Sequence, residues 1–339
     1  MKNIYKLLFV SILIAFITGC EKAPTDTKTQ VETEKKEVAA TKEAIKKDLK
    51  QSIQIFTADN KDGKITTKSI EAAFDEAGVP IGVNNNMNSP FSQRFPKVHY
   101  KVYNLAVFQN SDLTLKLIKK YPNFGALTPL TMSIWSDGDS MNISTLSLFG
   151  MSRAGEIPMD DADLIAYAEL VKSALLKAMP HGSFKELPYE DARPTESLAT
   201  NFEVEIDVEE VTDFTTYKED FQAEFEAEME PIGFLFPNYI NLQEEIFDEA
   251  GYDAYDFYDT YSICKFDVIY PVSKDHPEAG AWAPCSFYMY KKKDENVMRM
   301  GFLSVENWIS STNMKDKESM NPLREAQNMI ETIINEMIE

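Results

Sequence analysis

The sequence predicts an α+β protein built from two tandem copies of one unit. An eight-residue phrase, Pro-x-x-Gly-Ala-x-x-Pro, occurs at 122–129 and again at 277–284, at a spacing of 155 residues (277 − 122 = 155). The same spacing pairs Glu71 with Glu226, Ala72 with Ala227, Gly78 with Gly233, Asn86 with Asn241, Tyr103 with Tyr258 and Lys119 with Lys274. Strand-like alternation and helix-like stripes occur in each copy. We therefore expect a first repeat domain at 51–180, a linker at 181–200 and a second repeat domain at 201–339.

The N-terminus, residues 1–19, has the composition of a secretory signal peptide. Two lysines precede an apolar run at 7–17, which leads into Ile-Thr-Gly-Cys20. These last four residues resemble the lipobox of bacterial lipoproteins. The resemblance implies cleavage before Cys20, lipidation of this cysteine by palmitate-like acyl chains, and a membrane as partner. Glu21 then favours the outer membrane, facing the periplasm or the cell surface; an ordinary signal peptide or an uncleaved anchor is the alternative.

Residues 20–50 lack aromatic residues and are dominated by Thr, Lys and Glu, which predicts a disordered tether. The formal net charge is −21, and it becomes −23 after cleavage because residues 1–19 hold two lysines and no acid. A surface this acidic repels nucleic acid, so we expect no nucleic-acid partner. The sequence has no Gly-x-Ser-x-Gly, His-Glu-x-x-His or glycine-rich phosphate loop. No catalytic residues are therefore assigned, and enzymatic activity is the less favoured class.

In the first repeat, threonine caps, glycine stops and the Asp137-Gly138 turn delimit the elements. We expect, in order, a strand at 52–56, a helix at 67–77, a strand at 79–83, a helical turn at 88–90, a strand at 98–108, a helix at 111–121, a hairpin of 130–135 and 141–148, and a helix at 161–179.

The second repeat shows the same kinds of signal, of which the alternation at 202–208 is the clearest. We expect a strand there, then a helix at 215–229, a strand at 234–236, a helix at 242–250, a strand at 260–265, a hairpin of 283–290 and 297–305, and a last helix from Asn321-Pro322.

With these elements placed, each repeat resembles the bacterial family called domain of unknown function 302. The second repeat carries the pattern best, in Tyr261-Ser262-Ile263-Cys264, Pro277, Gly280 and Ala283-Pro284-Cys285. The resemblance covers about 66–178 and 215–338. It implies two tandem TBP-like α+β domains (β-α-β4-α with short extra helices), related by a pseudo-two-fold axis. Because no activity is established for the family, the resemblance implies architecture and not chemistry.

The cysteines Cys264 and Cys285 end one expected strand and begin another, whereas Gln109 and Leu130 stand at these places in the first repeat. If the two strands are neighbours, the thiols can come within disulfide range, and a periplasm is oxidising. A structural bridge or a pair of buried thiols is favoured over a redox or metal centre, because only His276 is near in sequence. We expect no metal and no cofactor.

The repeated phrase marks a corner or a pocket in each repeat. Its residues are Pro122, Gly125 and Pro129 in the first copy, and Pro277, Gly280 and Pro284 in the second. The aromatic residues near the acidic loop offer a different pocket wall: Tyr252, Tyr255, Phe257 and Tyr258.

Charge differs between matching loops of the two repeats. Residues 244–259 contain seven acids and no base, and residues 89–104 contain three bases and no acid. We expect the two loops to attract one another across the domains, with two separately solvated faces as the alternative. The residues concerned are Arg94, Lys97 and Lys101, and Glu244, Glu245 and Asp248.

Taken together, these signals predict a lipid-anchored periplasmic protein that acts as a non-enzymatic binding or scaffolding module. Its partner would be an unknown small ligand or a periplasmic protein. The alternative is a thiol-based redox or metal-binding protein that uses Cys264 and Cys285.

Overall fold

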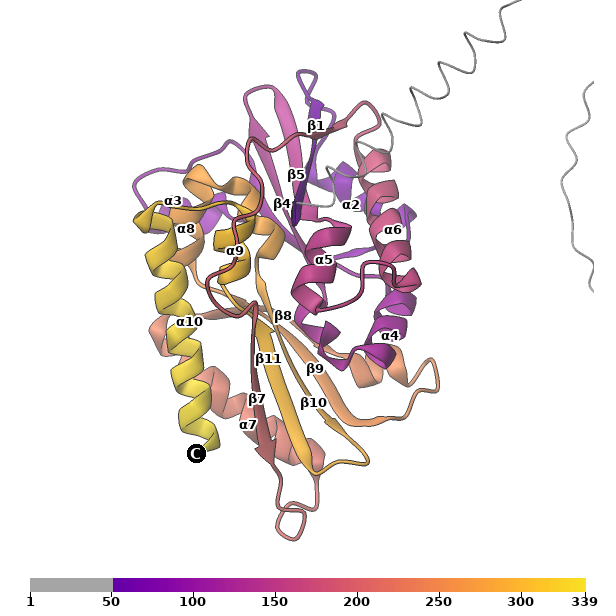
Figure 1. The fold of residues 1–339 in the computed structure, drawn as a ribbon. Coiled ribbons are helices and arrows are strands. Elements are labelled where there is room, and N and C mark those ends of the chain that lie inside the picture. The colour runs from indigo at the N-terminus through magenta and orange to yellow at the C-terminus, as the bar shows by residue number, and fades with distance from the viewer. Residues whose placement is uncertain (1–50) are drawn as a thin grey trace, which may run out of the picture. The chain divides into compact units, whose positions relative to one another are not determined.

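Two antiparallel β-sheets carry the chain in the computed structural model, which describes residues 51–339. The first sheet has the strand order β2-β3-β4-β5-β1-β6, and the second has the order β8-β9-β10-β11-β7 (Figure 1). The first sheet consists of β1 (Ile53–Asp59), β2 (Ile81–Asn86), β3 (Tyr103–Phe108), β4 (Leu130–Asp137), β5 (Ser140–Leu146) and β6 (Ser183–Lys185). The second consists of β7 (Ala199–Glu205), β8 (Leu235–Asn241), β9 (Tyr255–Cys264), β10 (Cys285–Lys292) and β11 (Val297–Leu303). Apart from β6, the strands follow one another in the same order in both sheets.

Helices cover one face of each sheet (Figure 1). In the first half of the described chain, residues 51–180, α2 (Thr67–Glu76) and α6 (Ala162–Ala178) pack together, and Phe74 of α2 meets Phe108 of β3 edge to face at 5.4 Å between ring centroids. In the second half, residues 201–339, α7 (Phe214–Met229) and α10 (Lys317–Ile338) take these places, and Phe225 of α7 stacks on Phe287 of β10 at 5.1 Å. Side chains alternate along a strand, so each sheet also presents a face that points away from its helices.

Shorter helices lie in the connections between the strands. The first half has α3 (Asn88–Arg94), α4 (Ser111–Lys120), the 3₁₀-helix η1 (Pro122–Leu127) and α5 (Leu148–Gly155). The second half has the 3₁₀-turn η2 (Glu230–Ile232), the π-helical turn η3 (Gln243–Phe247), α8 (Phe266–Asp275), the 3₁₀-helix η4 (Pro277–Trp282) and α9 (Glu306–Ser311).

The expected α+β class is confirmed, with differences at single elements. The local pattern assigned no helix at α8, where Pro271 lies inside the helix. The family resemblance implies a short helix between Cys264 and Pro277, which is where α8 lies. Helix α5 was not expected, because the expected strand ends at 148 and no element was assigned at 149–155; the Ser147 hydroxyl caps this helix by accepting from the backbone N–H of Gly150 at 3.0 Å. Helix α10 begins before the expected Asn321, because the Asp316 carboxylate caps it.

None of the helices within residues 51–339 combines the length and the apolar character that a membrane span requires. The predicted signal peptide at 1–19, the lipidation site Cys20 and the tether at 20–50 lie outside the described residues.

Candidate functional site

The repeated phrase forms the contact between the two halves. It folds as η1 in the first half and η4 in the second, and each of these short helices packs on the strands of the other half. Helix η1 lies on β10, and η4 lies on β4 and β5. Each sheet thus uses the face opposite its own helices to receive the corner of the other half.

Where η1 of the first half packs on the second sheet, tyrosines of that sheet make the contact. The backbone N–H of Gly125 donates to the hydroxyl of Tyr258 at 3.1 Å, and this hydroxyl donates to the carbonyl of Pro122. A Cβ on Gly125 would lie 2.7 Å from the Cβ of Tyr288, closer than packed carbon atoms come. Glycine at this position therefore allows η1 to reach the sheet.

In the other direction, hydroxyl side chains of the first sheet bind the backbone of η4. Ser133 donates to the carbonyl of Pro277 at 2.7 Å, and Thr131 donates to the carbonyl of Ala281 at 2.6 Å. A Cβ on Gly280 would lie against Ser133 and 2.7 Å from Leu105. These bonds satisfy buried carbonyl groups and set the position of one half on the other.

The linker adds a buried ion pair to this contact. Arg153 of α5 lies 2.6 Å from the carboxylate of Asp191, and the hydroxyl of Ser52 donates to the same carboxylate at 2.5 Å. Arg153 also donates to the hydroxyl of Ser310 in the second half at 2.5 Å. From the second half, the carboxylate of Glu278 accepts from the hydroxyl of Tyr189 in the linker at 2.6 Å, so side chains of both halves hold the linker.

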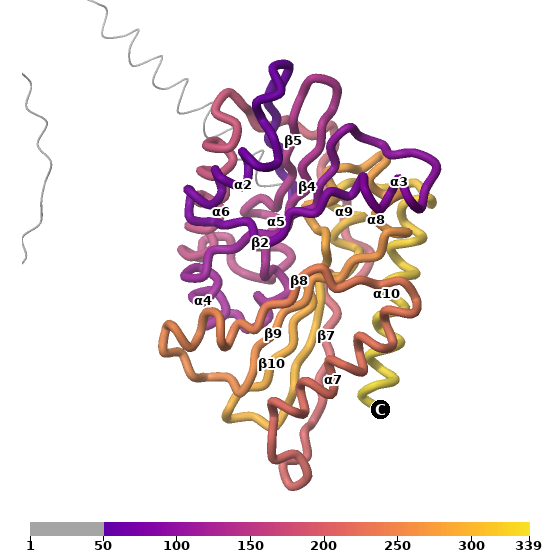
Figure 2. Tube along the Cα trace, turned by 180° about the vertical axis from the view of Figure 1, so that it is seen from behind, coloured from indigo at the N-terminus to yellow at the C-terminus, as the bar shows by residue number. Residues whose placement is uncertain are grey.

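A cleft of about 730 Å³ opens beside this contact. One wall comes from β2, β3 and the start of α3, and the opposite wall comes from β8, the end of β9 and the end of α7. The strands β2 and β8 are edge strands of their sheets and lie near the middle of the view in Figure 2. Leu105, which touches the position of Gly280, also lines the cleft, as does Pro284. The contact between the halves therefore sets the width of the cleft.

Aromatic rings and amide groups line the cleft together. Tyr261 lies at 5.8 Å from Phe236 and at 5.0 Å from Tyr239, measured between ring centroids. Asn85 and Asn238 bring side-chain amides from opposite walls. Among the described residues the buried Nδ2 of Asn238 has no hydrogen-bond partner. An unmade bond of this kind costs about 1–3 kcal/mol. Because the nitrogen itself is buried, a ligand accepts from it only after the side chain rotates toward the cleft.

The cysteines are free thiols in the structure. Cys264 is buried and lines the cleft, and Cys285 begins β10 beside it. Burial raises the pKa of Cys264 and of Cys285 to about 12, so both stay protonated at neutral pH. A protonated thiol is a poor nucleophile and a poor metal ligand. Within residues 51–339 no group of three or more His, Cys, Asp or Glu side chains is placed to hold a metal ion.

The oppositely charged loops find other partners. Asp256 and Asp259 pair with Lys291 and Lys218 within the second half. Arg94 lies over the ring of Phe266, with its guanidinium carbon 4.8 Å from the ring centroid. In the part of the chain that the structure describes, no ion pair therefore joins Arg94, Lys97 or Lys101 to Glu244, Glu245 or Asp248.

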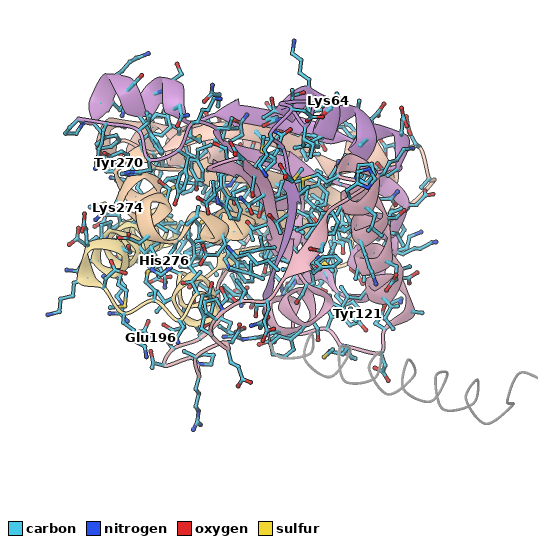
Figure 3. All side chains as sticks on the ribbon, turned by 90° about the horizontal axis from the view of Figure 1, so that it is seen from above. Lys64, Tyr121, Glu196, Tyr270, Lys274 and His276 are labelled. Atoms are coloured by element: carbon cyan, nitrogen blue, oxygen red, sulfur yellow. The ribbon has the colours of Figure 1, made fainter. Side chains whose placement is uncertain are left out.

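The acidic loop, residues 244–259, contacts the first half through a cation–π contact. The basic loop, residues 89–104, contacts the second half through hydrogen bonds. Lys119 of α4 lies 4.4 Å from the ring centroid of Tyr252, and the hydroxyl of Tyr270 donates to the carbonyl of Lys97 at 2.8 Å. On the same side, Tyr100 donates to the carbonyl of Lys274 at 3.1 Å. Figure 3 shows Tyr270, Lys274 and His276 following one another along α8 and just beyond its end.

Sequence reasoning missed most of the cleft. Tyr258, expected at a corner or pocket, is fully buried and stacks on Tyr290 at 5.1 Å. The residues that do line the cleft, such as Asn85 and Phe236, lie far apart in sequence and share no motif. The one local signal was the run of aromatic and amide residues from Phe234 to Tyr239, of which only 234–236 was predicted as a strand and none as part of a pocket.

Comparison with known proteins identifies one domain. Residues 208–337 match the family model "Domain of unknown function DUF302". The chain is also similar to a solved structure, the uncharacterized conserved protein DUF302 from Bacillus stearothermophilus, with 12% identity and a TM-score of 0.33 over 41% of this chain and 98% of that chain. No curated protein matches the sequence. The chain thus carries a DUF302 domain in its second half.

Proposed function

We propose that this protein is a binding module for a small organic ligand, which it holds in the cleft between its halves. The observation that carries the proposal is the cleft itself, about 730 Å³ in volume, with the unpartnered amide of Asn238 in its lining. Small-molecule sites measure about 300–1,000 Å³ and combine apolar walls with a few polar groups. The cleft has this size and this mixture of groups.

The paired strands hold the side chains that line the cleft in fixed positions. Asn85 and Leu105 are paired residues on β2 and β3, and Asn238 is held opposite Ser262 of β9. Side chains on paired strands are held in place more precisely than side chains on loops. We therefore expect the amides to orient the ligand and the rings to bind its apolar part.

The alternative, a thiol-based role, has less support. Cys264 reaches the cleft, but burial keeps its pKa near 12 and its thiol protonated. A reactive cysteine needs a stabilised thiolate. We assign Cys264 to the apolar lining of the cleft.

We also propose that the two halves are copies of one TBP-like unit related by a pseudo-two-fold axis, with the domains at 51–180 and 201–339. Three pairs of elements support this, because each begins 155 residues apart: α4 and α8 (266 − 111), η1 and η4 (277 − 122), and β4 and β10 (285 − 130). The common strand order of the two sheets supports it as well.

We further propose that Cys20 is lipidated and that the protein is anchored to the outer membrane, facing the periplasm. The support is the motif Ile-Thr-Gly-Cys20 after an apolar run. Feeding cells a labelled palmitate should label the wild-type protein and leave the Cys20→Ala variant unlabelled. Equal labelling of both would contradict the proposal.

Binding in the cleft can be tested with N-phenyl-1-naphthylamine, an uncharged dye that fluoresces in apolar sites. We expect one saturable site per chain. Val83 lies on β2 in the cleft wall, so Val83→Trp should narrow the cleft and weaken dye binding about tenfold. The matched control is Val208→Trp, because Val208 is exposed and does not line the cleft. Absence of saturable binding, or equal binding by both variants, would overturn the proposal.

A further inference from the structure

We infer that the ligand of the cleft is an organic cation, a substituted ammonium group carried on an apolar body. This inference rests on the proposed function of the cleft and adds the charge class of its ligand. It is carried by the acids, the aromatic rings and the partners of the nearby bases.

Two carboxylates lie one helical turn apart on the same wall of the cleft. Glu226 belongs to α7 and Glu230 follows its end, and both line the cleft. Residues at this spacing are neighbours on a helix surface, and like charges there repel each other. A cation bound between them removes this repulsion and gains attraction to both.

Three aromatic rings stand beside these acids. Phe236, Tyr239 and Tyr261 form one cluster in the cleft wall. The faces of such rings attract substituted ammonium groups, and the attraction grows when the cation loses water. Burial, together with the charge of Glu226, raises the pKa of Tyr261, which places this carboxylate close to the ring cluster. Rings and acids therefore act on the same part of a ligand.

The bases near the cleft are already engaged. Among the described residues that line the cleft there is no lysine or arginine. Behind the wall, Lys218 pairs with Asp259 at 3.0 Å, and Lys265 donates to the carbonyl of Ile232 at 2.5 Å. Arg94 lies over Phe266. The only charged side chains among the described residues that line the cleft are therefore Glu226 and Glu230, and these repel an anionic ligand.

The chain as a whole favours the same sign of charge. Its formal net charge is −21, and an acidic surface raises the local concentration of cations.

The first half provides an internal comparison. At the spacing of 155 residues, Ile81, Asn84 and Ala106 stand where the second half has Phe236, Tyr239 and Tyr261. Glu71 stands where the second half has Glu226, and its carboxylate accepts from the Nδ2 of Asn84 at 2.7 Å. The first half therefore has a carboxylate at this position but no ring cluster. The combination of acids and rings is built in the second half alone.

The test compares three probes that share a benzyl group: benzyltrimethylammonium, its uncharged carbon isostere neopentylbenzene, and the anion benzylphosphonate. Each is titrated against the full-length protein with N-phenyl-1-naphthylamine in the cleft. We expect benzyltrimethylammonium to displace the dye at about tenfold lower concentration than neopentylbenzene. Benzylphosphonate should be the weakest competitor.

The double variant Glu226→Gln with Glu230→Gln should lose about tenfold in affinity for benzyltrimethylammonium and keep its affinity for neopentylbenzene. The control is Glu224→Gln with Glu228→Gln, which makes the same change in net charge at exposed positions of α7 outside the cleft lining. This control should retain the preference for the cation.

The outcomes separate the inference from the proposed function. If neopentylbenzene competes as well as the cation while Val83→Trp still weakens dye binding, the charge class is wrong and the cleft remains a binding site. If both double variants lose the cation preference equally, long-range charge explains it and the inference is overturned. If Val83→Trp leaves dye binding unchanged, the proposed function fails, and the inference fails with it.

Discussion

The hydroxyl of Tyr258, in the second half, accepts a hydrogen bond from the backbone N–H of Gly125, in the first half, at 3.1 Å. The repeated glycine of the other copy, Gly280, lies against Ser133 and Leu105 of the first half. The two glycines of the repeated phrase thus serve one purpose. Each lets a short helix approach the sheet of the opposite half closely enough to form the contact beside the cleft.

Replacing Gly280 by alanine should destabilise the protein. The added Cβ would overlap Ser133 and Leu105, and overpacking of this kind costs about 1–3 kcal/mol. Urea unfolding measures the loss in the free energy of unfolding. Gly82→Ala is the control, because a Cβ at Gly82 meets no atom within 4 Å. Equal stability of the two variants would show that the close approach is not needed.

Replacing Asp191, a member of a buried ion pair, should destabilise the protein more than replacing the acid of an exposed ion pair. The Asp191→Ala variant leaves the guanidinium of Arg153, with 12% of its side chain exposed, in a buried place without its carboxylate. Breaking a buried pair costs about 3–5 kcal/mol. In the control pair, Lys64 and Asp62 keep 83% and 57% of their side chains exposed, and Figure 3 shows Lys64 at the outer side of the molecule.

For that exposed pair, Asp62→Ala should change the free energy of unfolding by less than about 1 kcal/mol. The measurement is urea unfolding of both variants under one set of conditions. A loss in Asp191→Ala no larger than that in Asp62→Ala contradicts the assignment of the linker contact.

His276 should make stability fall as the pH rises through neutrality. Burial lowers the pKa of its imidazole, but the carboxylates of Glu278, at 3.7 Å, and Asp316, at 3.3 Å, raise it more, so the pKa lies above 6.5. The folded state therefore favours protonated His276. This contribution is fully present below the unfolded pKa and is lost as the pH rises through the raised folded pKa.

The His276→Gln variant removes this contribution. We expect the stability difference between wild type and variant to be largest near about pH 6 and to shrink by about pH 8, as measured by urea unfolding across this range. A difference that does not change with pH would exclude the role of His276.

The thiols of Cys264 and Cys285 should react slowly with DTNB in the folded protein. With pKa values of about 12, their thiolate fraction near neutral pH is on the order of 10³-fold below that of an ordinary cysteine. The measurement uses the Cys20→Ala background, so that only these two thiols can react. A cysteine introduced by Val208→Cys, at an exposed position, gives the reference rate. If either native thiol reacts at this reference rate, the alternative of a thiol-based redox role is supported.

Local sequence patterns predicted the structure correctly where the residues of one segment are enough to specify it. Helix α6 and the Asp137-Gly138 turn between β4 and β5 lie where the sequence predicts them. Local patterns alone did not place α8, because a proline that is usually a helix breaker is tolerated within that helix at Pro271. Tertiary packing outweighs local preference at such places.

The sequence by itself determined the α+β class, the repeated corner phrase and the acidic character of the chain, because each depends only on residue types and short spacings. Only the tertiary structure decided which acids are paired, as with Asp256 and Lys291. It also decided where the cleft lies. Asn85 and Asn238 come to the same space because η1 and η4 each pack on the opposite sheet. Such a contact depends on how the two sheets pack on each other. Local periodicity reports only on neighbouring residues, so it does not predict contacts between segments this far apart in the chain.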